Sequence, residues 1–282
     1  MSGEAAERGA LARIGAAAVL EAAGLVRTGE VIDLAVPLGP ATPVPAHRHR
    51  VARFMERDGG DYAAGARRPG GFQFAEDTVL MPTHAGTHLD ALAHCWHDGR
   101  LCDGSPQETI RSTTGAQRCG AEKLGPVLTR GILLDVAGEA EPEAGRSIGA
   151  AELEAAAERA GVEVGEADAV LVRTGWLGRH GADGAAYFAG EPGIDLGAAR
   201  WLTDRGVSLV GADNFAIEPL PFPAGEVFPV HQHLIAEHGV PLLESASLDR
   251  LAARADGPFL FVALPLPLVG STASPLTPVA VL

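Results

Sequence analysis

The chain has 282 residues, of which 46% are hydrophobic, enough for one large core or two smaller ones. Its formal net charge is −14, and no long Lys/Arg run occurs, which argues against nucleic acid and anionic membrane surfaces as partners. Three irregularly spaced cysteines, no signal-peptide pattern and no apolar run of about 18 residues predict a cytoplasmic protein without a membrane span.

The first third of the chain combines one expected helix with short strands and a long irregular segment. Residues 5–25 are rich in Ala, Leu and Glu and predict a helix. A short strand is expected within residues 30–39, where Pro37 halts it. Residues 39–72 hold many Gly, Pro and Arg without a period and predict a long loop, and residues 74–86 predict a strand that leads into a cluster of histidines.

Strands and helices alternate through the rest of the chain. Residues 257–270 are β-rich but contain prolines, which suits an edge strand or a bend, and the tail is expected to be extended. With no repeat and no obvious linker, one α/β domain is the simplest prediction. The other expected helices are residues 149–161, 196–206 and 230–239, and the other expected strands are residues 130–138, 167–176, 207–214 and 240–245.

The stretch HAGTHLDALAHCWHDG, residues 84–99, contains four histidines and two aspartates. In an extended segment the even positions His84, His88 and Asp90 would face one side together, and Gly86 would allow a close backbone approach. A helical turn would also bring together His84 and His88, which are four residues apart. Two imidazoles and a carboxylate leave positions open for water or substrate, as in catalytic Zn²⁺, Mn²⁺ or Fe²⁺ sites. His94 could complete a second metal site or move protons, whereas His97 falls outside the pattern.

The segment from His84 to His94 resembles the HxGTHxDxPxH signature of the cyclase-like metal-dependent hydrolases, although Leu92 stands where the signature has Pro. This superfamily includes bacterial kynurenine formamidase, isatin hydrolase and proteins assigned as polyketide cyclases. Further similar segments extend the resemblance over nearly the whole chain after about residue 30. The resemblance implies a single compact α/β domain, residues 30–282, with a mixed, barrel-like sheet flanked by helices, preceded by a helical extension, residues 1–29. It also implies a homodimer or a higher homo-oligomer.

The resemblance also assigns functions to individual residues. It implies that His84, His88 and Asp90 bind the first metal, and that His94 is a proton shuttle or a ligand of a second metal. His231 matches a later histidine of the family, with His233 as its rival two residues on. Glu244 matches an acidic position at which formamidase-like members can bind a second metal, so that one or two Zn or Mn ions are expected per chain. The expected catalytic residues are His94, His231 and Glu244, and the expected metal ligands are His84, His88, Asp90, His94 and Glu244.

The reaction implied by the resemblance is hydrolysis of an amide, lactam or ester bond in a small, aromatic molecule through a metal-bound hydroxide. Two alternatives remain open from the sequence: a cyclase or dehydratase of aromatic polyketide metabolism with the same metal site, and a binding protein that has lost the chemistry. The weaker candidates for the site are Arg173 and Trp176, and the strand end with Asp213, Asn214 and Glu218.

Overall fold

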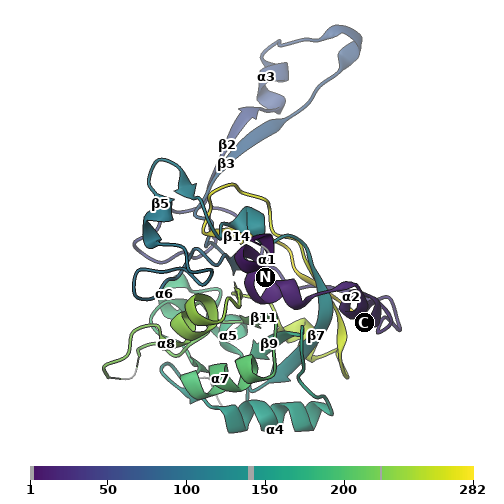
Figure 1. Cartoon of the computed structure of the whole chain (residues 1–282). Helices are drawn as coiled ribbons and strands as arrows, with labels where there is room; N and C mark the ends of the chain where they lie inside the picture. Colours follow the sequence, from purple (N-terminus) through teal and green to yellow (C-terminus); the bar gives the residue numbers. More distant parts are fainter. Residues whose placement is uncertain (1–2, 139–142, 223) are drawn as a thin grey trace.

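The computed structural model describes residues 3–138, 143–222 and 224–282, and a mixed sheet of nine strands forms its centre. The strand order is β1-β15-β13-β7-β9-β11-β12-β4-β14, with parallel pairing from β7 to β12 and antiparallel pairing elsewhere. The sheet curls into half a barrel with helices against it, which confirms the predicted α/β class (Figure 1). Its strands are β1 (Val31–Asp33), β4 (His88–Asp90), β7 (Val127–Asp135), β9 (Ala169–Arg173), β11 (Leu209–Ala212), β12 (Leu242–Glu244), β13 (Phe259–Ala263), β14 (Ala273–Pro275) and β15 (Val279–Val281).

The central strands are apolar on both faces because both faces are covered. In β9, Val170 and Val172 belong to the apolar cluster that includes residues of helices α4 (Ala150–Ala160) and α7 (Leu196–Asp204). Ala169 and Leu171 belong to the cluster on the opposite face. This arrangement explains why the parallel strands read as continuous hydrophobic runs rather than as alternating ones. The sheet is therefore a rigid platform, and its strand ends can hold functional groups in fixed positions.

The helices are short, and several begin or end at a recognisable signal. The predicted helix at 149–161 is observed as α4, where the Glu152 carboxylate accepts a hydrogen bond from the Gly149 amide. The predicted helix at 230–239 is also observed, as α8 followed by a π-helical segment, η5. The α-helices are α1 (Gly3–Arg8), α2 (Ala16–Ala23), α3 (Gly59–Ala63), α4 (Ala150–Ala160), α5 (Trp176–His180), α6 (Gly184–Tyr187), α7 (Leu196–Asp204), α8 (Pro229–His231) and α9 (Asp249–Ala252). The shorter elements are η1 (Gly9–Arg13), η2 (Pro69–Gly71), η3 (Gln107–Thr109), η4 (Ala121–Lys123), η5 (Gln232–Glu237), β5 (Ile110–Arg111), β6 (Gly115–Ala116), β8 (Ser147–Ile148) and β10 (Gly193–Ile194).

The single helix predicted for residues 5–25 is wrong, because the structure divides this region into α1, η1 and α2. The break between α1 and η1 lies at Gly9, which has a φ of +58°. A Cβ atom on Gly9 would lie 2.3 Å from the Gly239 carbonyl oxygen, and the adjacent Ala10 amide donates to that oxygen. The chain therefore leaves its helical path in order to dock on the loop after η5.

The long loop predicted for residues 39–72 is also wrong, since part of it forms an arm that projects from the body of the molecule (Figure 1). The arm consists of β2 (Ala52–Arg57) paired antiparallel with β3 (Glu76–Leu80), and α3 lies between them. Both strands are largely exposed, with Phe54 at 56% and Val79 at 54% relative exposure. Because neither face is buried, the strands lack the apolar alternation from which a sequence predicts a hairpin.

The β-rich segment at 257–270 is neither an edge strand nor a bend. It forms β13, which lies between β15 and β7 inside the sheet, and Pro265 and Pro267 follow the strand rather than interrupt it. Within residues 3–138, 143–222 and 224–282, no helix is both long enough and apolar enough to span a bilayer.

Candidate metal centre

Pairing between β4 and β12 brings together the most buried part of the candidate site. Glu244 of β12 lies directly opposite His88 of β4, and Leu243 lies opposite Leu89. Because side chains alternate along a strand, His88, Asp90 and Glu244 share one face while the two leucines enter the core. His88, Asp90 and Glu244 are all buried.

His84 and His94 approach the same aspartate from the chain segments on either side of β4. His84 Nε2 lies 3.2 Å from Asp90 Oδ1 and 3.0 Å from His94 Nδ1, and His94 Nε2 lies 3.9 Å from Asp90 Oδ2. His84 is outside the strand, because Gly86 turns the chain with a φ of +60°. Neither of the two geometries expected for this segment, extended or helical, holds throughout: only His88 and Asp90 belong to the strand, and the turn at Gly86 brings His84 to Asp90.

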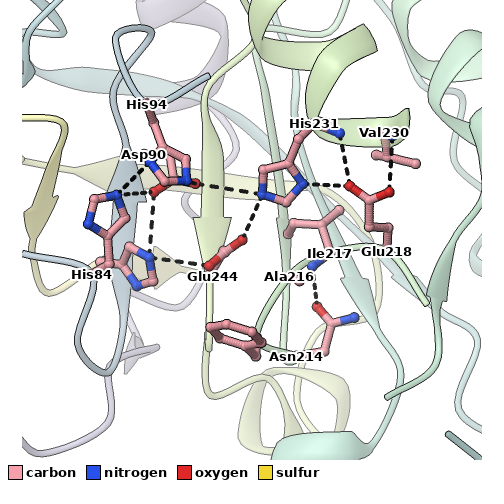
Figure 2. A network of polar contacts seen from close by, with 12 residues as sticks. His84, Asp90, His94, Asn214, Ala216, Ile217, Glu218, Val230, His231 and Glu244 are labelled. Carbon is pink, nitrogen blue, oxygen red and sulfur yellow. Dashed lines mark hydrogen bonds and ion pairs between the residues drawn. The ribbon is translucent and has the colours of Figure 1, made fainter. Parts of the chain in front are cut away.

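His231 reaches the centre from α8, on the far side of Glu244 (Figure 2). Its Nε2 lies 3.4 Å from Glu244 Oε1 and 4.0 Å from Asp90 Oδ2. Its Nδ1 lies 2.6 Å from Glu218 Oε1, and the same carboxylate accepts hydrogen bonds from the amides of His231 and Val230. Glu218 thus fixes both the ring and the turn that carries it.

Several buried atoms of this centre have no hydrogen-bond partner. These atoms are Nε2 of His88 and both carboxylate oxygens of Asp90. The hydrogen bond of His88 Nδ1 to the Gly86 carbonyl, 2.9 Å long, requires the proton of a neutral ring to be on Nδ1. The Nε2 lone pair then faces Glu244 Oε2 at 3.2 Å and Asp90 Oδ1 at 3.5 Å. Burial opposes a charge on His88, but its contact with Glu244 and the charge of Asp90 raise its pKa, so a cation, either a proton or a metal ion, is favoured between these groups.

The donor types fit a divalent transition metal. His84, Asp90 and His94 form one group and His88, Asp90 and Glu244 form another, with the ligand atoms of each group within 4.8 Å of one another. Imidazole nitrogen and carboxylate oxygen suit Zn²⁺ and Mn²⁺. Because the two groups share Asp90, the arrangement has donors for one ion or for a bridged pair.

Burial and neighbouring charges act in opposite directions on the pKa values of His94 and His231. Burial lowers the pKa of His94 to about 4, against the attraction of the Asp90 carboxylate. Burial also opposes a charge on His231, but its hydrogen bonds to Glu218 and Glu244 outweigh this and raise its pKa to about 10. His94 is therefore a neutral base at pH 7, whereas a proton or a metal ion is favoured at Nε2 of His231.

The pKa values of the two carboxyl groups in the centre are lowered despite burial. Burial raises the pKa of Asp90, but the positive charges of His94, His84 and His88 hold it well below its usual range. Burial and Asp90 raise the pKa of Glu244, yet its contacts with His231 and His88 lower it overall. Both groups are thus anionic acceptors at neutral pH, as metal ligands must be.

His233, the alternative to His231, and His97 both lie outside the candidate metal centre. His233 Nε2 contacts Thr203 and its Nδ1 contacts Glu237 at 2.9 Å, so it belongs to a surface group with Glu237. His97 is exposed and lies 2.8 Å from the Gln232 side chain. Of the two later candidates, the structure brings only His231 to Asp90.

Among the weaker candidates, Glu218 joins the centre and the others do not. Arg173 pairs with Asp135 and Asp249. Trp176 is buried and donates to the Tyr187 carbonyl. The sequence singled out both Glu218 and His231 but did not predict the contact between them, because the two residues come together only through the fold of the segment that joins them.

A pocket of about 540 Å³ opens beside the centre, and His84, Gly86 and His88 line one side of it. The rest of its wall comes from residues 36–43, from α5 and α6, and from the segment after β12. Phe188, Phe215 and Ser245 also line it, although none of them was singled out from the sequence as a candidate for the metal site. The centre is thus accessible to a molecule of substantial size.

Comparisons with known proteins place the chain in a family. The sequence model of the Cyclase family matches residues 32–219. Kynurenine formamidase of Bacillus cereus is 28% identical over 200 residues, which are 70% of this chain and 76% of the relative. Isatin hydrolase of Roseibium aggregatum is 28% identical over 266 residues, which are 89% of this chain and 91% of the relative.

Two solved structures show the same fold. The crystal structure of a novel cyclase aligns with a TM-score of 0.90 and 32% identity, and covers 98% of this chain and 94% of that one. An isatin hydrolase bound to the product analogue thioisatinate aligns with a TM-score of 0.69 and 22% identity, and covers 95% of this chain and 99% of that one. The second likeness concerns the fold alone.

Proposed function

The chain belongs to the Cyclase family, and on that premise we propose that it hydrolyses an amide, lactam or ester bond of a small, aromatic molecule. Its curated relatives include a kynurenine formamidase and an isatin hydrolase, which supports hydrolysis as the reaction class. The observation that carries the proposal is the set of buried, unpaired acceptors of His88 and Asp90 beside an open pocket.

The proposed cofactor is one or two divalent ions, Zn or Mn. A divalent ion held there would make water more acidic and would polarise the carbonyl group of the substrate. The side of the centre formed by His84 and His88 borders the pocket, so the substrate carbonyl enters from that side. The residues that would hold the ion or ions are His84, His88, Asp90, His94 and Glu244.

His94 is the proposed proton carrier. Its lowered pKa of about 4 keeps it neutral at pH 7, so it can accept a proton from the attacking water. The water oxygen forms a bond to the carbonyl carbon, the C–N or C–O bond breaks, and His94 returns the proton to the leaving atom. The two roles of His94 belong to different metal contents: with one ion held by the other residues its Nε2, 3.9 Å from Asp90 Oδ2, carries the proton, whereas with two ions it would be a ligand.

His231 and Glu244 are proposed to support the other side of the centre. Glu218 holds the proton of His231 on Nδ1, which directs the Nε2 lone pair towards Glu244 and Asp90. When no ion is bound, the raised pKa of His231 keeps a proton on Nε2 as well, where it faces Glu244. A bound ion would take the place of that proton, and His231 would then be a further donor to it.

The test is an assay of the metal-loaded protein on a formyl arylamine, an isatin and an aryl lactone, with His84→Ala beside the wild type. The expected result is turnover of at least one substrate by the wild type, lost in His84→Ala together with metal. Retention of both metal and activity by His84→Ala would contradict the proposal. A metal-loaded wild type that hydrolyses none of the three would favour the cyclase or dehydratase alternative. A tightly bound Co²⁺ without exchangeable water would favour the binding protein.

A further inference from the structure

The pocket has room for much more than the bond that reacts. Its volume of about 540 Å³ lies within the range typical of sites for drug-sized ligands. His84, Gly86 and His88 form only one side of it. The remaining wall must therefore contact the part of the substrate that does not react, and its chemistry selects that part.

Most of this wall is apolar. Leu38, Leu177 and Leu248 line it from three different segments of the chain. Phe188 and Phe215 add an aromatic corner, because their ring centroids are 4.9 Å apart and their planes meet at 89°. An aryl or alkyl group placed against this corner would bury apolar surface and extend an edge-to-face contact.

The polar side chains in the wall already have partners within the protein. The Tyr187 hydroxyl lies 2.9 Å from Ser245 Oγ. Asp213 accepts hydrogen bonds from the Thr174 amide and hydroxyl at 2.7 and 2.6 Å and from the Gly175 amide at 2.8 Å. These groups stabilise the wall and offer few unsatisfied atoms to a ligand, in contrast to the metal centre.

The charged side chains of the wall are acidic, and one of them, Asp249, is already paired with Arg173. Among the described residues that line the pocket none is Lys or Arg, while Asp213 and Asp249 are acidic. Arg48 is near the pocket but does not line it; it donates to the His84 carbonyl at 2.7 Å, and its guanidinium carbon lies 5.7 Å from the centre of the Phe215 ring. A carboxylate inserted into the pocket would lose its hydration without gaining a cation from the wall.

We infer that the part of the substrate remote from the scissile bond is an uncharged aryl or alkyl group, and that the site selects against substrates with a carboxylate there. The inference rests on the proposed hydrolysis for its kinetic test. It concerns the pocket wall, however, and a binding measurement can test it without turnover.

The kinetic test compares two p-nitrophenyl esters of equal size on the metal-loaded protein. The 5-methylhexanoyl ester ends in an isopropyl group, and the glutaryl ester ends in a carboxylate of the same shape. After division by the alkaline hydrolysis rate of each ester, kcat/KM is expected to favour the neutral ester by about tenfold or more. Equal values, or a preference for the glutaryl ester, would overturn the inference.

Phe188→Ala tests whether the pocket wall causes the preference for the neutral ester. Phe54→Ala, on the exposed arm, is the matched control. Phe188→Ala is expected to lower kcat/KM for the 5-methylhexanoyl ester by about tenfold, mainly through KM, and to leave the acetyl ester nearly unchanged. Phe54→Ala is expected to change neither. An equal effect of Phe188→Ala on the acetyl and 5-methylhexanoyl esters would contradict a role in selecting the substrate.

If the metal-loaded wild type hydrolyses neither ester, the proposed function fails, and binding decides the inference separately. Calorimetric titration with the neutral ketone 2-acetylnaphthalene is expected to show binding to the wild type and to Phe54→Ala. Binding to Phe188→Ala is expected to be about tenfold weaker. An absence of binding, or equal binding to all three proteins, would overturn the inference.

Discussion

The metal centre and the wall of the adjacent pocket are both lined by buried groups, but they satisfy their polar atoms in opposite ways. At the centre, His88 Nε2 and both oxygens of Asp90 have no hydrogen-bond partner. In the wall, the equally buried Asp213 receives three hydrogen bonds from Thr174 and Gly175. Asp90 therefore has oxygens available to bind a cation, whereas the oxygens of Asp213 are already satisfied by the protein and stabilise the fold.

The largest expected effect concerns Asp90, which the two groups of metal donors share. Asp90→Asn removes the carboxylate charge and one acceptor oxygen, so we expect kcat/KM to fall by about 1000-fold, together with loss of metal. Asp213→Asn is the matched control and should retain metal, because its oxygens face amides and a hydroxyl. Elemental analysis and steady-state kinetics measure both. Equal metal loss in the two variants would remove the distinction between centre and wall.

The second prediction concerns the stability of the wall. Burial raises the pKa of Asp213 from 3.8 to about 6, against its hydrogen bonds from Thr174 and Gly175. The folded state therefore binds this proton more tightly than the unfolded state, and its stabilising effect is fully present below about pH 4 and lost as the pH rises through about 6. As the pH rises from about 4 to above 6, the titration of Asp213 should therefore lower the free energy of unfolding by about 3 kcal/mol.

Denaturant unfolding at a series of pH values tests this contribution. Because Asn does not titrate, Asp213→Asn should flatten the fall in unfolding free energy between pH 4 and 7, whatever its effect on the absolute value. An identical pH dependence in the variant and the wild type would show that Asp213 does not have the raised pKa.

The third and smallest effect concerns Glu218, which orients His231 without belonging to either group of metal donors. Glu218→Gln places an amide NH₂ next to the hydrogen-bond donors of Val230 and His231, so some of the hydrogen bonds that orient His231 are lost. We expect metal affinity to fall by about 10- to 100-fold with the fold retained.

Glu237→Gln is the matched control, because the Glu237 carboxylate contacts Nδ1 of His233, a histidine outside the centre, as the Glu218 carboxylate contacts Nδ1 of His231. It should leave metal affinity unchanged, as measured by competition with a chromophoric chelator. An unchanged affinity in Glu218→Gln as well would show that the contact with His231 has no influence on the centre.

How far the sequence predicts this molecule depends on whether the information is local. The donors His84, His88, Asp90 and His94 lie within one short segment, so their spacing alone suggests a common site. The central strands are equally predictable, because their burial on both faces produces continuous apolar runs.

The rest of the site depends on long-range arrangement. The contact between Glu218 and His231 requires the loop that joins them, and the pocket wall combines segments from residue 36 to residue 249. Only half of the arm was predicted: β3 lies within the strand expected at residues 74–86, whereas β2 lies within the expected loop, because an exposed strand has no buried face to impose a period.

The most direct test of the account is the metal content of protein purified without a chelator or a His-tag and then incubated with Zn²⁺ or Mn²⁺. We predict that the wild type binds one or two ions per chain, and that Glu244→Gln binds fewer ions or binds them more weakly. Two ions that fall to one would support a bridged pair, and one ion in both proteins would support a single ion. A wild type that takes up no metal would contradict the claim that the unpaired acceptors of His88 and Asp90 hold a cation.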